Sequence, residues 1–400
     1  MSGPVLWKAH VKVQWDQARQ REDADPAILD HEPPTTGPSA AAALKSSLEG
    51  APVSVPTIST DVAIIGAGPI GLELAIACKR AGIDYLHLEK GQIGQTISGF
   101  PPQMQFFSSS DRIALAGVPI QTPGQQKCTK GEYLAYLRML VGQFELQVRT
   151  YEPVVRLRRE PAGFELLTQP AGGTRRILAR RLVLATGGTA RPRKLEIPGE
   201  ELPHVSPCFE DPHRYFQRRL LVIGGRNSAA EAALRCHRAG AHVTVSYRGA
   251  AFGPKSIKYW LLPELTGLIA AGQITCHYRT RPLAISPTHV TLERLEDVRS
   301  FEVPADFVLV QIGYLADMSL ARMAGVELTG PGQLPRYNEQ TMETSAAGVY
   351  IAGTAVAGTQ QSYHVFLENC HIHVQRIVAA LQGQAPPSPP APAAYTQQEA

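Results

Sequence analysis

Gly66, Gly68 and Gly71 form the pattern in this sequence that most clearly could do chemistry. They follow a short apolar run, 62–65, and precede an alanine-rich stretch with helical spacing. In a strand–turn–helix unit the first glycine permits a tight turn, the second lets backbone approach a pyrophosphate, and the third lets the helix pack close to the strand. The helix N-terminus presents unpaired N–H groups to such phosphates. The pattern favours a dinucleotide site over a turn that binds nothing.

An acidic residue completes this pattern at the end of a second apolar run, 85–88. Glu89 lies eighteen residues after Gly71, where a carboxylate can accept hydrogen bonds from the ribose hydroxyls of an adenosine. Pro69 in the turn and Lys90 beside the acid belong to the same predicted site. Strand, glycines, helix, strand and acid therefore occur in order between residues 61 and 90.

A second strand–turn–helix pattern runs from residue 219 to 248, with a less regular turn. Arg226 stands where the first turn has its middle glycine, and Ala229 fills the third, close-packing position, which the motif allows. The residues that we predict to contact a nucleotide here are Gly224, Arg226, Asn227 and Ser228.

The second unit ends in Tyr247-Arg248, where the first ends in an acid. A carboxylate would repel a 2′-phosphate, whereas arginine offers it a charge and a planar fork. We therefore expect NADPH rather than NADH at this site, with a surface arginine as the alternative. Lys255 and Lys258 follow closely and could share the phosphate or be solvated.

Two further strands run into small residues. The stretch 181–188 ends in Ala-Thr186-Gly187-Gly, where small side chains let backbone run beside a cofactor. The stretch 348–354 ends in Gly353-Thr354 and resembles the third flavin motif, with threonine where many such motifs have aspartate. Both pairs join the predicted dinucleotide site of the first unit.

Composition and charge restrict the function further. Four hundred residues suggest two or three domains, and the sequence shows no apolar run that reads as a membrane span and no secretory signal. Residues 213–300 carry 13 Lys and Arg against 5 Asp and Glu, but no nucleic-acid motif accompanies this charge. We expect no nucleic acid and no membrane partner, and the sequence leaves a homo-oligomer open.

The six cysteines, at positions 78, 128, 208, 236, 276 and 370, are scattered. No CxxC occurs, and such scatter is typical of a reduced compartment, which predicts a cytoplasmic protein. We expect Cys78 and Cys236 to be small buried hydrophobes and leave Cys128 and Cys370 as candidate single nucleophiles. No metal site is expected, because His371 and His373 diverge on a helix.

Together these motifs resemble two-dinucleotide flavoproteins of the thioredoxin-reductase type, and most closely the YpdA-type family of bacillithiol-disulfide reductases. The stretches that carry this resemblance are 106–110 (FFSSS), 223–229 (IGGRNSA), 247–249 (YRG), 256–264 (SIKYWLLPE) and 366–369 (FLEN). The resemblance covers about residues 60–383. It implies FAD in the first unit, NADPH in the second, and reduction of a low-molecular-weight thiol disulfide.

The expected fold is α/β, with two Rossmann-like dinucleotide-binding domains and the NADPH domain inserted into the FAD domain. The expected divisions are a disordered extension (1–57), an FAD domain in two parts (58–190 and 316–383), an NADPH domain (191–315) and a disordered tail (384–400). Residues 5–15 alternate in polarity and could form an edge strand. Tyr133 and Tyr136, on a stretch with helical spacing, are expected in the core. A strand is expected around residues 146–150 and a helix over residues 365–381.

One departure from the family bears on the substrate. Many members have a cysteine after the Gly-x-Gly-Pro turn, where this chain has Ile70. The leading hypothesis remains an NADPH-oxidising disulfide reductase that works without a CxxC relay, and the catalytic residues stay unassigned. A flavin monooxygenase is the enzymatic alternative, from a weak likeness at Pro198-Gly199, His204 and Phe209. A flavin redox sensor that does not turn over is the alternative of another class.

Overall fold

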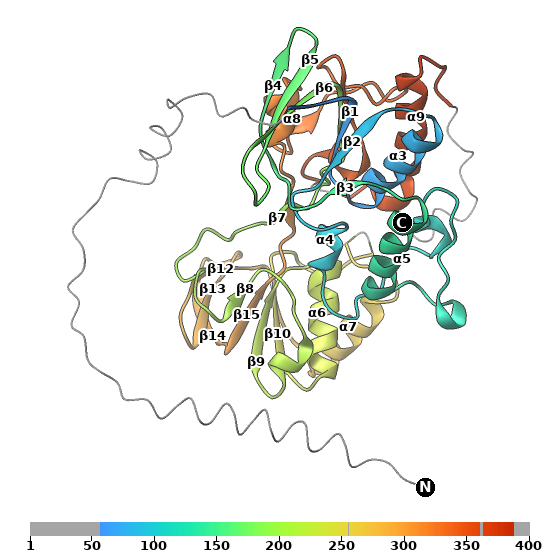
Figure 1. Ribbon diagram of the computed structural model, residues 1–400. Coiled ribbons are helices and arrows are strands. Elements are labelled where there is room, and N and C mark those ends of the chain that lie inside the picture. The colour runs from blue at the N-terminus through green and yellow to red at the C-terminus, as the bar shows by residue number, and fades with distance from the viewer. Residues whose placement is uncertain (1–56, 255, 361–362, 388–400) are drawn as a thin grey trace, which may run out of the picture. The chain divides into compact units, whose positions relative to one another are not determined.

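The computed structural model describes residues 57–254, 256–360 and 363–387 (Figure 1). Its larger sheet has seven strands in the order β3-β2-β1-β6-β5-β4, with β19 also paired to β6. These strands are β1 (Thr57–Ile65), β2 (Tyr85–Leu88), β3 (Val148–Arg149), β4 (Val154–Glu160), β5 (Gly163–Thr168), β6 (Arg175–Leu184) and β19 (Val349–Ile351). The central strand β1 pairs in parallel with β2 and β6, and its residues 62–65 are buried, as a continuous apolar run predicts for an inner parallel strand.

Helices pack beside this sheet and form one apolar core with it. The helices are α3 (Pro69–Arg80), α4 (Gln95–Ser98), α5 (Lys130–Gln143), α8 (Ser319–Met323) and α9 (His371–Leu381). Short 3-10 turns accompany them: η1 (Asp111–Ile113), η2 (Pro123–Gln125), η4 (Gly353–Ala357) and η5 (Leu367–Asn369). Strands β17 (Leu328–Thr329) and β18 (Leu334–Pro335) form a small antiparallel ribbon. Helix α5 begins at a capping box in which Thr129 and Glu132 bond each other's backbone N–H groups, which satisfies two donors that a helix start leaves free.

The second parallel sheet has the order β11-β10-β9-β15-β8. Its strands are β8 (Val205–Ser206), β9 (Arg219–Ile223), β10 (His242–Tyr247), β11 (Thr275–Tyr278) and β15 (Phe307–Val310). The turn η3 (Pro212–Tyr215) lies between β8 and β9, and helices α6 (Asn227–Arg238) and α7 (Leu262–Ala270) accompany the sheet. An antiparallel sheet of β12 (Thr280–Ile285), β13 (His289–Arg294) and β14 (Ser300–Pro304) adds to this unit. Two apolar clusters, separate from the core of the larger sheet, fill it.

The chain crosses twice between the larger, mixed sheet and the parallel sheet of the second unit, and the two crossings pair with each other. Strand β7 (Arg191–Pro192) leaves the first unit, and β16 (Tyr314–Leu315) returns to it as the antiparallel partner of β7. Strand β19 then rejoins β6 in the larger sheet. The predicted α/β fold, with one dinucleotide-binding unit inserted into another, is confirmed, while the residue limits given above for each domain stay a prediction.

The element boundaries differ from the expected ones at a few places. We expected a helix from residue 365, but α9 begins at His371, because Asn369 accepts the Phe366 N–H at 2.9 Å and closes a 3-10 turn first. The expected strand 146–150 is reduced to Val148–Arg149. The suggested edge strand at 5–15 and most of both predicted tails lie outside the described residues. No helix among the described residues is long and apolar enough to cross a membrane.

His373 on α9 gives the fold a measurable sensitivity to acid. Its side chain is buried, and its Nδ1 has no hydrogen-bond partner among the described residues. Burial, with repulsion from Arg376 and His371, lowers the pKa of His373 from 6.5 to about 4. The folded protein therefore keeps this ring neutral while the unfolded chain takes up a proton below about pH 6.5, so stability falls as the pH drops from 6.5 towards 4.

We predict that His373→Leu makes stability less dependent on pH. Wild-type protein should lose about 2 kcal/mol more than the variant between about pH 7.5 and about pH 5. Urea unfolding followed by circular dichroism at both values measures this difference. His213, which is exposed on η3, provides the control as His213→Leu. Equal losses in wild type and His373→Leu would show that His373 does not titrate on unfolding.

Candidate dinucleotide sites

The first glycine turn contains two glycines that the protein itself requires and one that it does not. Gly66 has φ +109°, and a Cβ there would lie 2.5 Å from the Ala185 carbonyl oxygen. A Cβ at Gly71 would collide with the Gly66 carbonyl oxygen. At Gly68 a Cβ would meet no described atom within 4 Å, and φ is an ordinary −72°. The glycine at 68 therefore keeps a space open, as a bound pyrophosphate requires.

Helix α3 directs an uncompensated N-terminus at this space. Gly68 is its N-cap and Pro69 its first residue, no side chain caps it, and its first turn contains no acid. Proline suits this position because it has no N–H to leave unpaired. The remaining N–H groups and the positive end of the helix dipole favour an anion. The residues present fit the phosphates of FAD.

Glu89 lies at the ribose end of the same turn. Its buried carboxylate accepts the Ala67 N–H at 2.7 Å and the Gly91 N–H at 2.8 Å. A carboxylate offers about four acceptor positions, so two remain for a ribose diol. Lys90, the other predicted residue here, is exposed.

His87 is a residue of this site that the sequence analysis missed. Its ring is fully buried beneath the turn, and Nε2 lies 2.9 Å from the Gly66 carbonyl oxygen. Burial lowers the pKa of His87 to about 4, so the ring is neutral near pH 7 and donates Nε2–H to that oxygen. This bond fixes the Gly66 peptide. A histidine two residues before the acid of a dinucleotide motif was the available signal.

The predicted residues of three distant segments meet beside this turn. The Gly188 N–H donates to Thr354 Oγ1 at 2.9 Å, which joins the end of β6, with Thr186 and Gly187, to the start of η4. Gly353 has φ +69°, and a Cβ there would lie 3.5 Å from the Cβ of Ile70. The position where the family has a cysteine therefore faces the third flavin motif, and in this chain it is apolar and buried.

The second glycine turn repeats the frame of the first. Gly224 has φ +152°, and a Cβ there would collide with the Gln311 carbonyl oxygen. Helix α6 starts after Arg226 with no side-chain cap and no acid in its first turn, so it too offers N–H groups to an anion. Arg226 and Ser228 are exposed, whereas Asn227 Oδ1 accepts the Lys258 N–H at 2.8 Å.

Of the three basic residues proposed for a 2′-phosphate, the structure describes two, Arg248 and Lys258, and their surroundings differ. Arg248 follows β10 and is exposed, without an ion-pair or hydrogen-bond partner in the part of the chain that the structure describes. Lys258 Nζ instead lies 5.9 Å from the ring centroid of Phe366. Lys255 falls outside the described residues. The geometry thus favours Arg248 as the residue ready to receive a phosphate.

All six cysteines are unpaired. Burial raises the pKa of Cys78, Cys236 and Cys370 to about 12, that of Cys128 and Cys276 to about 11, and that of Cys208 as well. The expectation that Cys78 and Cys236 are buried is confirmed. Cys128 and Cys370, held open as nucleophiles, are fully buried too, and the Cys370 thiol donates to the Phe366 carbonyl at 2.9 Å. Neither resembles a reactive thiolate.

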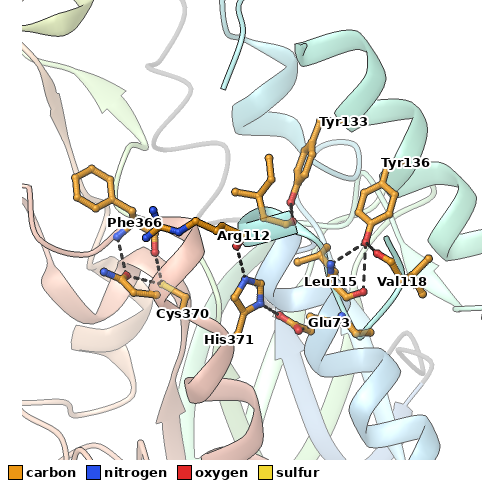
Figure 2. Close-up of polar contacts among 12 residues, drawn as sticks. Glu73, Arg112, Leu115, Val118, Tyr133, Tyr136, Phe366, Cys370 and His371 are labelled. Atoms are coloured by element: carbon orange, nitrogen blue, oxygen red, sulfur yellow. Dashed lines mark hydrogen bonds and ion pairs between the residues drawn. The ribbon is translucent and has the colours of Figure 1, made fainter. Parts of the chain in front are cut away.

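The remaining polar groups near α3 are structural (Figure 2). His371 Nδ1 lies 2.8 Å from Glu73, and its Nε2 lies 3.0 Å from the Arg112 carbonyl oxygen. The Tyr133 and Tyr136 hydroxyls bond backbone carbonyls and are buried, as expected of core residues. No group of three potential metal ligands occurs among the described residues.

Gly68→Val is predicted to abolish FAD binding while leaving the fold intact. The valine Cβ would enter the open space beside the helix N-terminus, where no described atom lies within 4 Å of it. Flavin released on denaturation, compared with protein concentration, measures the loss. Gly142→Val, at a helix glycine that also has open space, controls for the added side chain. Stoichiometric flavin in Gly68→Val would refute the assignment of the turn.

Arg248→Ala is predicted to weaken NADPH use by about tenfold to a hundredfold, since it removes a charge-assisted contact to the 2′-phosphate. NADH use should change little. The two values of kcat/KM for flavin reduction measure the effect. Arg299→Ala, on the exposed turn before β14, should leave both unchanged. Equal losses with both nucleotides would mean that Arg248 serves the fold.

Comparison with known proteins agrees with this geometry. Bacilliredoxin reductase Bdr of Bacillus subtilis (strain 168) is 34% identical over 319 residues, 80% of this chain and 96% of the relative. The structures of bacillithiol disulfide reductase Bdr (YpdA) from Staphylococcus aureus and Bacillus cereus are 34% and 35% identical, with TM-scores of 0.76 and 0.77. They cover 82% and 81% of this chain and 99% of their own. The resemblance to YpdA-type proteins is confirmed.

A flavin-containing monooxygenase from Stenotrophomonas maltophilia shares the fold at 19% identity and a TM-score of 0.64, and this likeness concerns the fold alone. The model of the pyridine nucleotide-disulphide oxidoreductase family matches residues 63–353, which include both glycine turns and Gly353. The chain belongs to this family and is an NAD(P)H-dependent flavoprotein oxidoreductase whose cofactors are FAD and NADPH.

Proposed function

We propose that this protein uses NADPH to reduce a low-molecular-weight thiol disulfide, with bacillithiol disulfide as the first candidate. The observation that carries the proposal is the likeness, at 34–35% identity over 99% of their chains, to two structures named bacillithiol disulfide reductase. In the overall reaction NADPH, one proton and the disulfide give NADP⁺ and two thiols. The hydride supplies the electron pair that cleaves the S–S bond.

The chain's own part in this reaction is to hold and orient. Bound FAD supplies the two-electron chemistry that connects the nucleotide to the disulfide. The open space at Gly68 and the start of α3 receive the flavin phosphates, and Glu89 receives the ribose. Thr354 accepts the Gly188 N–H where the third flavin motif meets the chain that follows β6. Arg248 and the start of α6 receive NADPH.

A protein dithiol takes no part in the proposed reaction. A relay needs two sulfurs within bonding reach, with Cα atoms about 4.4–6.8 Å apart, whereas the six cysteines are unpaired and their thiols are held protonated. Ile70 also removes the cysteine of the family pattern. The substrate disulfide must therefore be reduced without a mixed disulfide to this chain. Unpaired cysteines support a reducing, cytoplasmic location.

A turnover assay tests the proposal. In the first assay the purified flavoprotein is mixed under argon with NADPH and bacillithiol disulfide, glutathione disulfide or cystine, and NADPH consumption is followed. In a separate assay oxygen is supplied and no disulfide is added. Multiple turnovers with a disulfide, releasing two thiols for each NADPH, support it and exclude a sensor that does not turn over. Turnover with oxygen but with none of the disulfides would overturn it. So would a failure to turn over with any of these acceptors.

Replacement of all six cysteines by alanine should leave the reduction of bound FAD by NADPH intact. No thiol lies on the route proposed here, although four of the six are fully buried core residues and their loss will lower stability. The measurement is the bleaching of visible flavin absorbance on mixing with NADPH under argon. If bleaching disappears while FAD remains bound, a cysteine takes part.

Ile70→Cys should raise the rate of disulfide reduction, since it restores a thiol at the position that faces Gly353. Ile70→Ser is the matched control, because serine is similar to cysteine in size and polarity but has no sulfur. Rates with bacillithiol disulfide at saturating NADPH measure the effect. If both variants behave alike, the side chain at 70 acts through packing only.

A further inference from the structure

Tyr247 occupies the position in the second unit that Glu89 occupies in the first. Ile65 pairs with Leu88 across β1 and β2, and Ile223 pairs with Ser246 across β9 and β10. The residue after Leu88 is Glu89, and the residue after Ser246 is Tyr247. The same register aligns Gly66 with Gly224, the first glycine of each turn. The residue after Gly66, Ala67, therefore corresponds to Gly225.

The two residues treat the turn beside them differently. In the first unit the Glu89 carboxylate accepts the Ala67 N–H at 2.7 Å. In the second unit the aromatic ring of Tyr247 covers the turn, and a Cβ at Gly225 would collide with its Cδ2 and Cε2 atoms. A Cβ at Gly249 would collide with the other edge of the ring, at Cε1 and the hydroxyl. The ring thus lies between two glycines.

Backbone conformation does not explain these glycines. Neither Gly225 nor Gly249 has a positive φ, so an L-residue could adopt either conformation. At both positions the three atoms nearest to a Cβ placed there belong to the Tyr247 side chain. The space that its ring takes therefore accounts for glycine at 225 and 249.

The ring is also held from a third side. Phe252 stacks on Tyr247 with centroids 5.0 Å apart and an angle of 6° between the planes. Tyr278 in turn packs edge-on against Phe252, at 5.3 Å and 63°. Such aromatic contacts stabilise beyond the area they bury. Two glycines and two aromatic residues keep the ring over the turn.

We infer that Tyr247 is a specificity-determining residue that selects NADPH against NADH. A carboxylate at this place would bond the 2′-hydroxyl of NADH and repel the 2′-phosphate of NADPH. The ring fills the place of that carboxylate, and the next residue, the exposed Arg248, offers a positive charge to the 2′-phosphate. Selectivity then has a repulsive and an attractive part, as discrimination between close analogues often requires. The inference rests on NADPH as the electron donor and not on which disulfide is reduced.

Titration calorimetry of NADP⁺ and NAD⁺ into the oxidised flavoprotein tests this role without turnover. Wild type should prefer NADP⁺. In Tyr247→Glu, NADP⁺ should bind about tenfold more weakly and NAD⁺ about tenfold more tightly, a shift in their ratio of about a hundredfold. Tyr247→Gln, which adds an acceptor without a charge, should shift the ratio in the same direction by less.

His242→Glu is the matched control, because it places the same carboxylate at the exposed start of β10, and it should leave the ratio as in wild type. An unchanged ratio in both Tyr247 variants, with flavin content and melting temperature preserved, would overturn the inference. So would equal binding of NADP⁺ and NAD⁺ by wild type. Absence of disulfide turnover with the NADP⁺ preference intact would instead count against the proposed substrate alone.

Discussion

The contact between the Gly66 carbonyl and helix α3 is the constraint on which the first cofactor site depends. That oxygen lies where any side chain at Gly71 would have to be, and it accepts a hydrogen bond from the buried ring of His87. The helix can approach its strand only because residue 71 is glycine. This close approach sets where α3 starts, and so places the open space at Gly68 in front of its N–H groups and Ile70 against Gly353.

The inserted unit shows how one backbone frame serves two nucleotides. Both turns have a left-handed first glycine whose missing Cβ leaves room for a neighbouring carbonyl, that of Ala185 in one and that of Gln311 in the other. Both helices start without a cap or an acid. The units differ within the turn, where Arg226 and Ala229 replace Gly68 and Gly71, and again beyond the second strand, where Tyr247 replaces Glu89. We infer that the frame provides phosphate binding and that the residues after the second strand select the nucleotide.

Local patterns predicted the frame but not the packing on it. The spacing of Gly66, Gly71 and Glu89 was sufficient because each acts within one strand–turn–helix unit. The roles of His87 and Gly225 depend on contacts with the Gly66 carbonyl and the Tyr247 ring, and the spacing of the glycines and the acid does not show these contacts. The start of α9 was placed too early because apolar spacing does not show that Asn369 captures the Phe366 N–H. Lys258 was grouped with Arg248 by closeness in sequence, whereas its ammonium lies near Phe366.

The protonation of the six cysteine thiols has a consequence for the proposed disulfide reduction. Thiol–disulfide exchange proceeds through the thiolate, and each of the six thiols here has a pKa raised by burial. Hardly any thiolate exists near neutral pH to attack a substrate and leave half of it attached to the protein. The same property slows oxidation to sulfenic acid, which also follows thiolate character and exposure. Oxidative stress, which raises the concentration of disulfides, would thus leave these six thiols largely unmodified, so the proposed disulfide reduction would continue under the conditions that create its substrate.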